Sequence, residues 1–139
     1  MEPAIGVGDV VLVDMAYFSE NQPRVGDVVL YKAKSVVNGP TVKRIVALGG
    51  SRVQLKNSKL IVDDRVIDEP YLRQDGAVTA YSQTWGPIEL PAGCIILLGD
   101  YRDHSQDSRV DNCSFVDDLI GLVRYVSPSA EPKNIREVR

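Results

Sequence analysis

A lysine within a β-branched, apolar run is the first residue whose setting suggests chemistry. Lys43 lies in the run Thr41–Val46, and strand alternation places it on the same face as Thr41 and Ile45, opposite Arg44. One of the two basic side chains can therefore point inward. Burial lowers the pKa of a lysine, and a neutral amine can act as general base for a serine nucleophile. The pattern leaves a second interpretation open, in which Lys43 and Arg44 both reach solvent at a strand edge.

A second cluster is the polar loop Gly99–Arg109, which follows an apolar strand and combines hydroxyls, carboxylates and guanidinium groups. This composition is typical of a hydrogen-bonded, ion-paired network beside a site. A solvated turn or an acidic, calcium-type loop has a similar composition. The loop lacks the EF-hand spacing, so we expect no metal here. His104, the only histidine, lies in this loop and is interpreted as a solvated side chain.

The third cluster is the N-terminal segment Met1–Ile5, which is apolar, stiffened by Pro3 and followed by Gly8-Asp9. By itself it specifies no chemistry.

These clusters belong to a chain of 139 residues, which fits one domain with a single core. The formal net charge of −3, with both signs interspersed, predicts no nucleic-acid partner. Apolar runs such as Cys94–Leu98 are far shorter than the roughly 20 residues of a membrane helix. No targeting segment is visible, so the protein is either cytosolic or has an anchor outside this sequence.

Two cysteines, Cys94 and Cys113, are too few for a disulfide scaffold, and their spacing offers no zinc site. We interpret them as two separate buried thiols, although an extracytoplasmic location would permit a disulfide between them. No metal and no other cofactor is expected.

The elements that must position these clusters read as short strands rich in Val, Ile and Leu, separated by Gly, Pro and Asp. The expected strands are Asp9–Asp14, Asp27–Tyr31, Val42–Leu48, Val53–Leu55, Leu60–Val62, Ile95–Leu98 and Ile120–Tyr125. Residues 56–58 and 63–65 read as hairpin turns, which favours antiparallel sheets over parallel βαβ units. We therefore predict a mainly β fold of antiparallel coiled sheets with few or no helices.

Three other features bear on the organisation of the chain. The phrase Gly-Asp-Val-Val-Leu occurs at 8–12 and at 26–30, and we interpret each copy as a turn that leads into a buried strand. The polar stretch Arg73–Gly86 is expected to leave the core. The residues from Ser127 onward read as a frayed tail.

In their order and in their residues, these clusters resemble the conserved boxes of bacterial type I signal peptidases. Met1–Ile5 with Gly8-Asp9 is similar to the family's Ser-Met-x-Pro-Thr/Ala-Leu/Ile box, and Gly99–Arg109 is similar to its Gly-Asp-Asn-Arg-Asp-x-Ser-x-Asp-Ser-Arg loop. Further boxes match at Arg24–Lys32, Val42–Gly50 and Lys59–Leu72. The resemblance implies a catalytic domain over residues 1–126, of the fold shared with SOS-repressor proteases, and a C-terminal tail over 127–139.

The resemblance also implies roles for residues in this chain. Lys43 would be the general base and Ser105 would orient its amine. Buried ion pairs that hold the loop against the strand would come from Arg44, Asp100, Asp107 and Arg109. The substrate groove would be formed by Met1, Ile5, Pro40, Thr41 and Val42, with 40–42 pairing with an extended substrate. Specificity for small residues at positions −3 and −1 of a signal peptide would follow from pocket size.

The chain departs from the family pattern at four places. Tyr101 stands where Asn is usual, Gly49 where Pro is common, and Asp63-Asp64 where an Asn/Asp-Gly turn is favoured. More seriously, the family's nucleophilic serine immediately precedes the residue aligned with Met1, so it is absent from this sequence. We therefore expect the 139-residue chain itself to be inactive.

The resemblance implies that the partners are signal-peptide-bearing precursors, and that the full-length protein acts at the extracytoplasmic face of the bacterial cytoplasmic membrane, held there by an N-terminal anchor. Two alternatives differ in class. One is a serine-less module that binds precursors without cutting them. The other is an SOS-type Ser/Lys autoprotease, which lacks the Gly99–Arg109 loop pattern.

Overall fold

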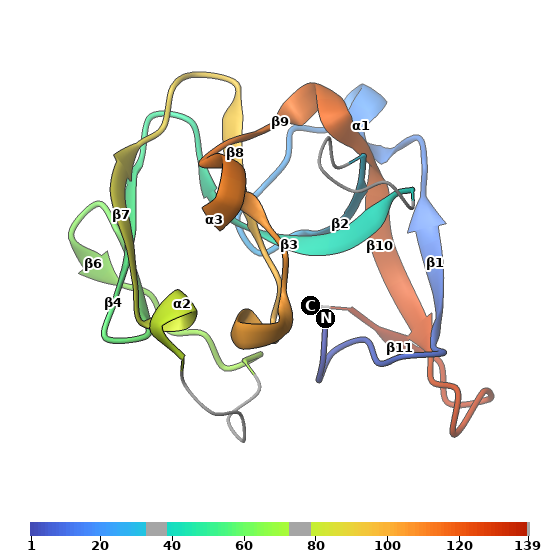
Figure 1. Ribbon diagram of the computed structural model, residues 1–139. Helices are drawn as coiled ribbons and strands as arrows, with labels where there is room; N and C mark the ends of the chain where they lie inside the picture. The colour runs from blue at the N-terminus through green and yellow to red at the C-terminus, as the bar shows by residue number, and fades with distance from the viewer. Residues whose placement is uncertain (33–38, 73–78, 139) are drawn as a thin grey trace.

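The structure is a computed structural model, and it describes residues 1–32, 39–72 and 79–138. Seven strands form the larger of two sheets: β1 (Val10–Asp14), β2 (Val28–Tyr31), β3 (Thr41–Leu48), β8 (Cys94–Leu98), β9 (Ser114–Phe115), β10 (Leu119–Ser127) and β11 (Arg136–Glu137). The smaller sheet contains β4 (Arg52–Lys56), β5 (Lys59–Val62), β6 (Arg65–Val66) and β7 (Thr84–Glu89). Figure 1 shows the two sheets side by side, with β3 and β8 between them.

All the described strand pairs are antiparallel. The larger sheet runs in the order β1-β10-β2-β3-β8-β9, with β11 also paired to β10, and the smaller sheet runs β6-β5-β4-β7. The described helices are single turns of three or four residues: α1 (Tyr17–Glu20), α2 (Ala80–Gln83), η1 (Arg102–His104), α3 (Ser108–Asp111) and η2 (Val116–Asp118). The prediction of a mainly β, antiparallel fold with few helices is confirmed.

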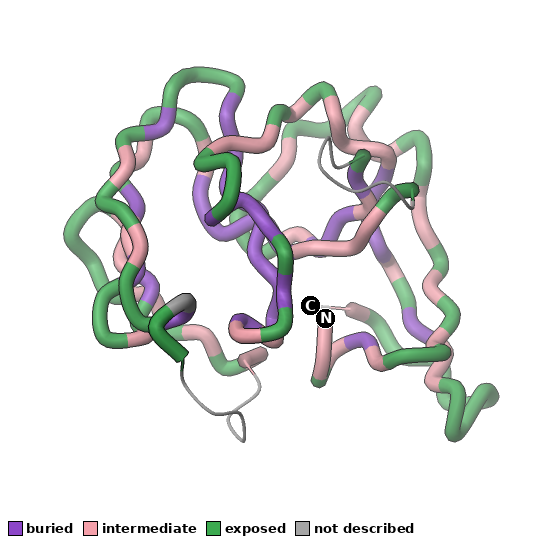
Figure 2. The backbone as a smooth tube through the Cα atoms, in the orientation of Figure 1, coloured by how far each residue is buried: buried purple, intermediate pink, exposed green. Residues whose placement is uncertain are grey.

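Strand β8 lies at the centre because both of its faces are covered. Ile96 and Leu98 pack in an apolar cluster with residues of β3, β4 and β5. Ile95 and Leu97 point to the opposite face and pack with residues of β2, β3 and β10. Figure 2 shows the buried residues concentrated along β3 and β8. A continuous apolar run is what a strand buried on both faces requires.

The two hairpin turns expected at residues 56–58 and 63–65 join β4 to β5 and β5 to β6. Their central residues all have positive φ: Asn57, Ser58, Asp63 and Asp64. Two consecutive positive-φ residues are typical of the tight turn whose twist matches antiparallel strands. Asp63 and Asp64 therefore adopt a turn conformation in which Asn-Gly or Asp-Gly is more usual.

Both copies of Gly-Asp-Val-Val-Leu are turns that lead into strands, with φ of 86° at Gly8 and 98° at Gly26. The second copy enters β2, where Val28 and Val29 are buried. The first enters β1, where Val10 and Leu12 are 67% and 62% exposed. The prediction that both strands are buried is therefore wrong for β1, which lies at the edge of the larger sheet and is covered on one side only.

Two other expectations about the chain need correction. Residues 73–78 of the predicted excursion lie outside the described residues, but 80–83 form α2 and Thr84 begins β7, which pairs with β4. The tail after Ser127 is not frayed, because β11 pairs with β10 and the Val138 amide donates to the Arg124 carbonyl at 2.9 Å.

Candidate active site

Lys43 lies on β3 and is half-buried. Burial lowers the pKa of its amine below the ordinary value for lysine, and the Arg109 charge acts in the same direction. The carboxylates of Asp107 and Asp100 oppose this shift, though by less than burial. The neutral amine, the form that can accept a proton, is therefore easier to reach at Lys43 than at an exposed lysine.

Arg44, the next residue, is 1% exposed. Its Nε and Nη2 donate to the two carboxylate oxygens of Asp100 at 3.0 and 2.9 Å, and its Nη1 donates to the Gly26 carbonyl at 3.0 Å. The Tyr71 ring lies 4.0 Å from the guanidinium carbon. The interpretation in which both basic residues reach solvent is therefore excluded.

Asp107 and Arg109 form a second buried ion pair, inside the loop that follows β8. Arg109 Nε and Nη2 each donate to an Asp107 carboxylate oxygen at 2.8 Å. Asp107 also caps α3 and accepts a hydrogen bond from the Gly99 amide at 3.1 Å. Arg109 Nη2 donates in addition to the Arg102 carbonyl at 2.6 Å. The pair therefore ties the start of the loop to its end.

Ser105 is 8% exposed, and within the described part of the chain its hydroxyl has no hydrogen-bond partner. A Cβ added to Gly99 would lie 2.2 Å from Ser105 Oγ and 3.7 Å from Lys43 Nζ. Both atoms therefore lie beside Gly99, where no larger residue fits. Because the structure contains no hydrogen bond between them, the orienting role of Ser105 stays a prediction.

A cavity of about 440 Å³ opens beside Lys43. It is lined by three segments that are distant in sequence: Met1, Glu2, Ile5, Gly6 and Val7; Thr41, Val42 and Lys43; Tyr101 and His104. Four of the five residues expected in the substrate groove are therefore in its wall. The fifth, Pro40, immediately precedes β3. It is exposed and does not line the cavity.

The N-terminal segment brings its first backbone nitrogen close to the lysine. Burial lowers the pKa of the Met1 amino group, and the positive charge of Lys43 lowers it further. Asp100 and Glu2 act in the opposite direction. Met1 and Lys43 also line the same cavity, so the first residue of the given sequence lies at the candidate site.

A third ion pair was not anticipated from the sequence. Arg102 is bound by the carboxylate of Glu69 through both of its terminal nitrogens, and Tyr71 donates to the same carboxylate at 2.7 Å. Burial and the Glu69 charge raise the pKa of Tyr71. Glu69 and Tyr71 lie in residues 68–72, at the end of the Lys59–Leu72 box. The resemblance alone gives these two residues no role. That segment braces the loop through Arg102 and the strand through Arg44.

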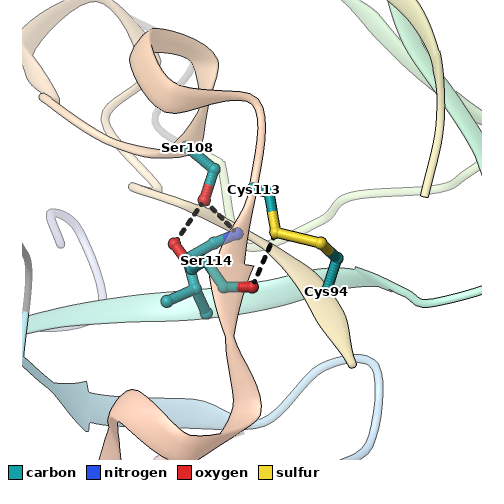
Figure 3. The surroundings of a disulfide bond; sticks show 5 residues. Cys94, Ser108, Cys113 and Ser114 are labelled. Carbon is teal, nitrogen blue, oxygen red and sulfur yellow. Dashed lines mark hydrogen bonds between the residues drawn. A yellow bond between two sulfur atoms is a disulfide. The ribbon is translucent and has the colours of Figure 1, made fainter. Parts of the chain in front are cut away.

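Cys94 and Cys113 form a disulfide with a Cα–Cα distance of 5.5 Å, so the interpretation as two separate thiols is wrong. The two residues meet because β9 returns alongside the start of β8, pairing Ile95 with Ser114. Figure 3 shows the bond beside Ser108, whose hydroxyl lies 3.0 Å from that of Ser114. The bridge encloses the whole loop that contains Ser105 and both members of the Asp107–Arg109 pair.

In the part of the chain that the structure describes, no group of three or more His, Cys, Asp or Glu side chains is arranged to hold a metal ion. Among the same residues, no helix has the length and apolar character needed to cross a bilayer.

The chain is similar to known proteins in both sequence and fold. The sequence model of the family "Signal peptidase, peptidase S26" matches residues 1–127. Signal peptidase I of Bacillus caldolyticus is 31% identical in a match that covers 90% of this chain and 72% of that protein. The chloroplastic thylakoidal processing peptidase 1 of Arabidopsis thaliana is 29% identical in a match that covers 93% of this chain but 40% of the plant protein.

A crystal structure of a signal peptidase I from Enterococcus faecalis superposes with a TM-score of 0.63 at 23% identity. The match covers 73% of this chain and 97% of that one, and it supports the fold. The chain thus has the architecture of a signal peptidase, and its sequence is similar to those of several processing peptidases. It belongs to the signal peptidase family, peptidase S26, a family of serine endopeptidases that process signal peptides.

Proposed function

We propose that this chain supplies the general base and the substrate groove of a signal peptidase, with Lys43 acting on a serine that directly precedes Met1. That position falls outside the 139 residues. The observation that carries the proposal is the lowered pKa of the half-buried Lys43 amine, together with its closeness to the Met1 nitrogen. A serine joined to that nitrogen lies beside a group able to take its proton.

In the proposed reaction, the neutral Lys43 amine accepts the serine proton as the serine oxygen attacks the carbonyl carbon of the scissile bond. The ammonium group then gives that proton to the leaving amine, and an acyl-enzyme remains. In the second half, water attacks the acyl carbon while Lys43 accepts its proton. The ammonium group then returns that proton to the serine oxygen as the ester bond breaks, and the signal peptide leaves with a free carboxyl group. Ser105 would keep the amine in place, since its hydroxyl is buried beside the same glycine.

Strand β3 supports binding of an extended substrate. In the ladders that the structure describes, Thr41, Val42 and Lys43 pair with β2 alone, because the pairing with β8 begins at Arg44. The other edge of 41–43 is therefore free of strand pairing and adjoins the cavity. An added substrate strand there would place alternate side chains against Met1, Ile5 and Val42, whose small apolar wall suits short residues.

The proposed setting is the extracytoplasmic face of a bacterial membrane, with exported precursors as substrates and a membrane anchor N-terminal to these residues. The Cys94–Cys113 disulfide supports an oxidising compartment. The family match favours this function over that of an SOS-type autoprotease.

The test compares the 139-residue chain with a chain extended at its N-terminus by family-like residues that end in serine. Cleavage of an Ala-x-Ala precursor peptide is followed by mass spectrometry. We expect no cleavage by the shorter chain, cleavage by the extended chain, and loss of that activity in Lys43→Met. Lys59→Met makes the same change at an exposed position of β5 and serves as the control. An extended, folded chain that binds the peptide without cutting it would establish a binding module instead.

A further inference from the structure

The C-terminal residues 128–138 lie beyond the part of the chain that the family model matches. They nevertheless have defined structure. The Ser127 hydroxyl donates to the Pro132 carbonyl at 2.8 Å, and β11 then returns antiparallel to β10. Figure 1 shows that this return brings the C-terminal end of the chain next to the N-terminal end. The tail, defined as residues 128–138, therefore lies against the segment that lines the cavity.

The tail makes three contacts with the chain over residues 1–9. The Ser129 amide donates to Asp9 Oδ1 at 2.9 Å, and Arg136 Nη2 donates to the Ala4 carbonyl at 2.8 Å. Val138 packs in the apolar cluster that includes Ile5 and Met1. The contacts thus fall on Ala4, on the cluster that contains Ile5, and on Asp9.

Two hydrogen bonds within residues 1–9 are local. The Ile5 amide donates to the Met1 carbonyl at 2.9 Å, and the Gly6 amide donates to Asp9 Oδ2 at 2.8 Å. Such bonds shape these residues, while packing of Ile5 with Val28 and Val123 holds them on the larger sheet. The bond from Arg136 joins the segment to strand β11 and, through it, to β10 of the larger sheet.

From these contacts we infer that Arg136 is a positioning residue for catalysis, holding the Met1–Ile5 segment at the distance from Lys43 that the reaction needs. The inference rests on the proposed function, because the tail would position the segment to which the proposed nucleophilic serine is joined. Arg136 is exposed, so its hydrogen bond adds little to the stability of the fold. Its effect is on geometry, and displacement of a reacting group by about 1 Å can lower a rate by up to about a hundredfold.

The first test uses hydrogen exchange in the 139-residue chain, which requires no catalysis. Arg136→Ala should speed exchange of the amides of residues 5–9 while the β3 amides and the thermal midpoint change little. Lys133→Ala removes the same charge from an exposed position in the tail and should leave exchange unchanged. Unchanged exchange in Arg136→Ala would overturn the inference.

The second test uses the serine-extended chain. Arg136→Ala should lower kcat roughly tenfold with KM nearly unchanged, because the groove remains while the nucleophile is displaced. Arg136→Lys should recover most of the loss, since an ammonium group can still donate to the Ala4 carbonyl. Equal kcat values in the parent and in Arg136→Ala would overturn the inference. An extended chain that is inert before any tail substitution would instead count against the proposed function, and the exchange experiment would still decide the role of the tail.

Discussion

Arg44 and Asp100 form a two-pronged ion pair between β3 and the residue after Gly99, with both side chains almost completely buried. The neighbouring residue, Lys43, is thereby held against the loop that contains Ser105. The pair thus couples the strand of the proposed base to the loop that surrounds it.

Asp100→Asn should lower the free energy of unfolding by about 3–5 kcal/mol, because it leaves the buried Arg44 charge uncompensated. Urea denaturation measures the change. Arg52→Ala breaks a pair of similar length with Asp64 at the surface and should cost less than about 1 kcal/mol. A loss in Asp100→Asn no larger than that of the control would show that the buried pair does not hold the strand and the loop together.

Lys43→Met should raise the free energy of unfolding at neutral pH. Burial lowers the pKa of Lys43 in the folded chain, so between this value and the ordinary value the unfolded state binds more protons, and stability rises with pH. The penalty is complete below the folded-state pKa and disappears toward about pH 10, near the ordinary lysine value. The gain in Lys43→Met should therefore shrink as pH rises.

Denaturation curves at neutral pH and at about pH 10 test this trend. Lys59→Met is the matched control, since it removes a lysine that is exposed on β5. A gain in Lys43→Met that stays constant or grows with pH would contradict the lowered pKa.

Gly99→Ala should destabilise the chain by about 1–3 kcal/mol, because the added methyl group would lie 2.2 Å from Ser105 Oγ and 2.6 Å from Ser105 Cβ. Adding Ser105→Gly to this variant should recover much of the loss. Gly6→Ala, whose methyl group would meet its nearest neighbour at 3.5 Å, is the control for the backbone effect. Equal losses with and without Ser105→Gly would locate the clash elsewhere.

Removal of the disulfide by Cys94→Ala with Cys113→Ala should lower the free energy of unfolding by about 3 kcal/mol, the value typical of a closed loop of this length. Reductant should lower the thermal midpoint of the parent chain and leave that of the double variant unchanged. Alkylation of the unfolded, unreduced parent should label neither cysteine. Labelling of both would show two thiols.

Much of the fold was predictable because its strands are short, apolar and punctuated by turn residues. Asn57-Ser58 and Asp63-Asp64 indicated their hairpins correctly, and Cys94–Leu98 is buried on both faces as its continuous apolar run suggests. β7 was missed because its residues, Thr84–Glu89, include Gly86 and Pro87, which break the usual strand pattern. β11 was missed because two residues are too few to form a pattern.

Contacts that join distant segments were harder to predict. Alternation placed Lys43 and Arg44 on opposite faces, but it could not show that Arg44 meets Asp100, since their meeting depends on the register between β3 and β8. The disulfide depends on the return of β9 beside β8, and β9 has only two residues. The Glu69–Arg102 pair depends on where the smaller sheet lies against the loop, which no local pattern encodes.

The two connections between the smaller and the larger sheet lie next to each other, and together they are called the neck here. The smaller sheet leaves the larger sheet after β3 and returns at β8, and at this neck the Gly50 amide donates to the Leu90 carbonyl at 2.8 Å while the Leu90 amide donates to the Ser51 carbonyl at 2.9 Å. A Cβ on Gly49 would lie 2.7 Å from the Pro91 carbonyl oxygen, so the two connecting segments nearly touch. Because its two ends are adjacent, the segment between them can gain or lose residues without changing the distance between β3 and β8. The smaller sheet can therefore change in length during evolution while the spacing between Lys43 and the Gly99–Arg109 loop stays constant. The condition is that Glu69 and Tyr71 still reach Arg102 and Arg44.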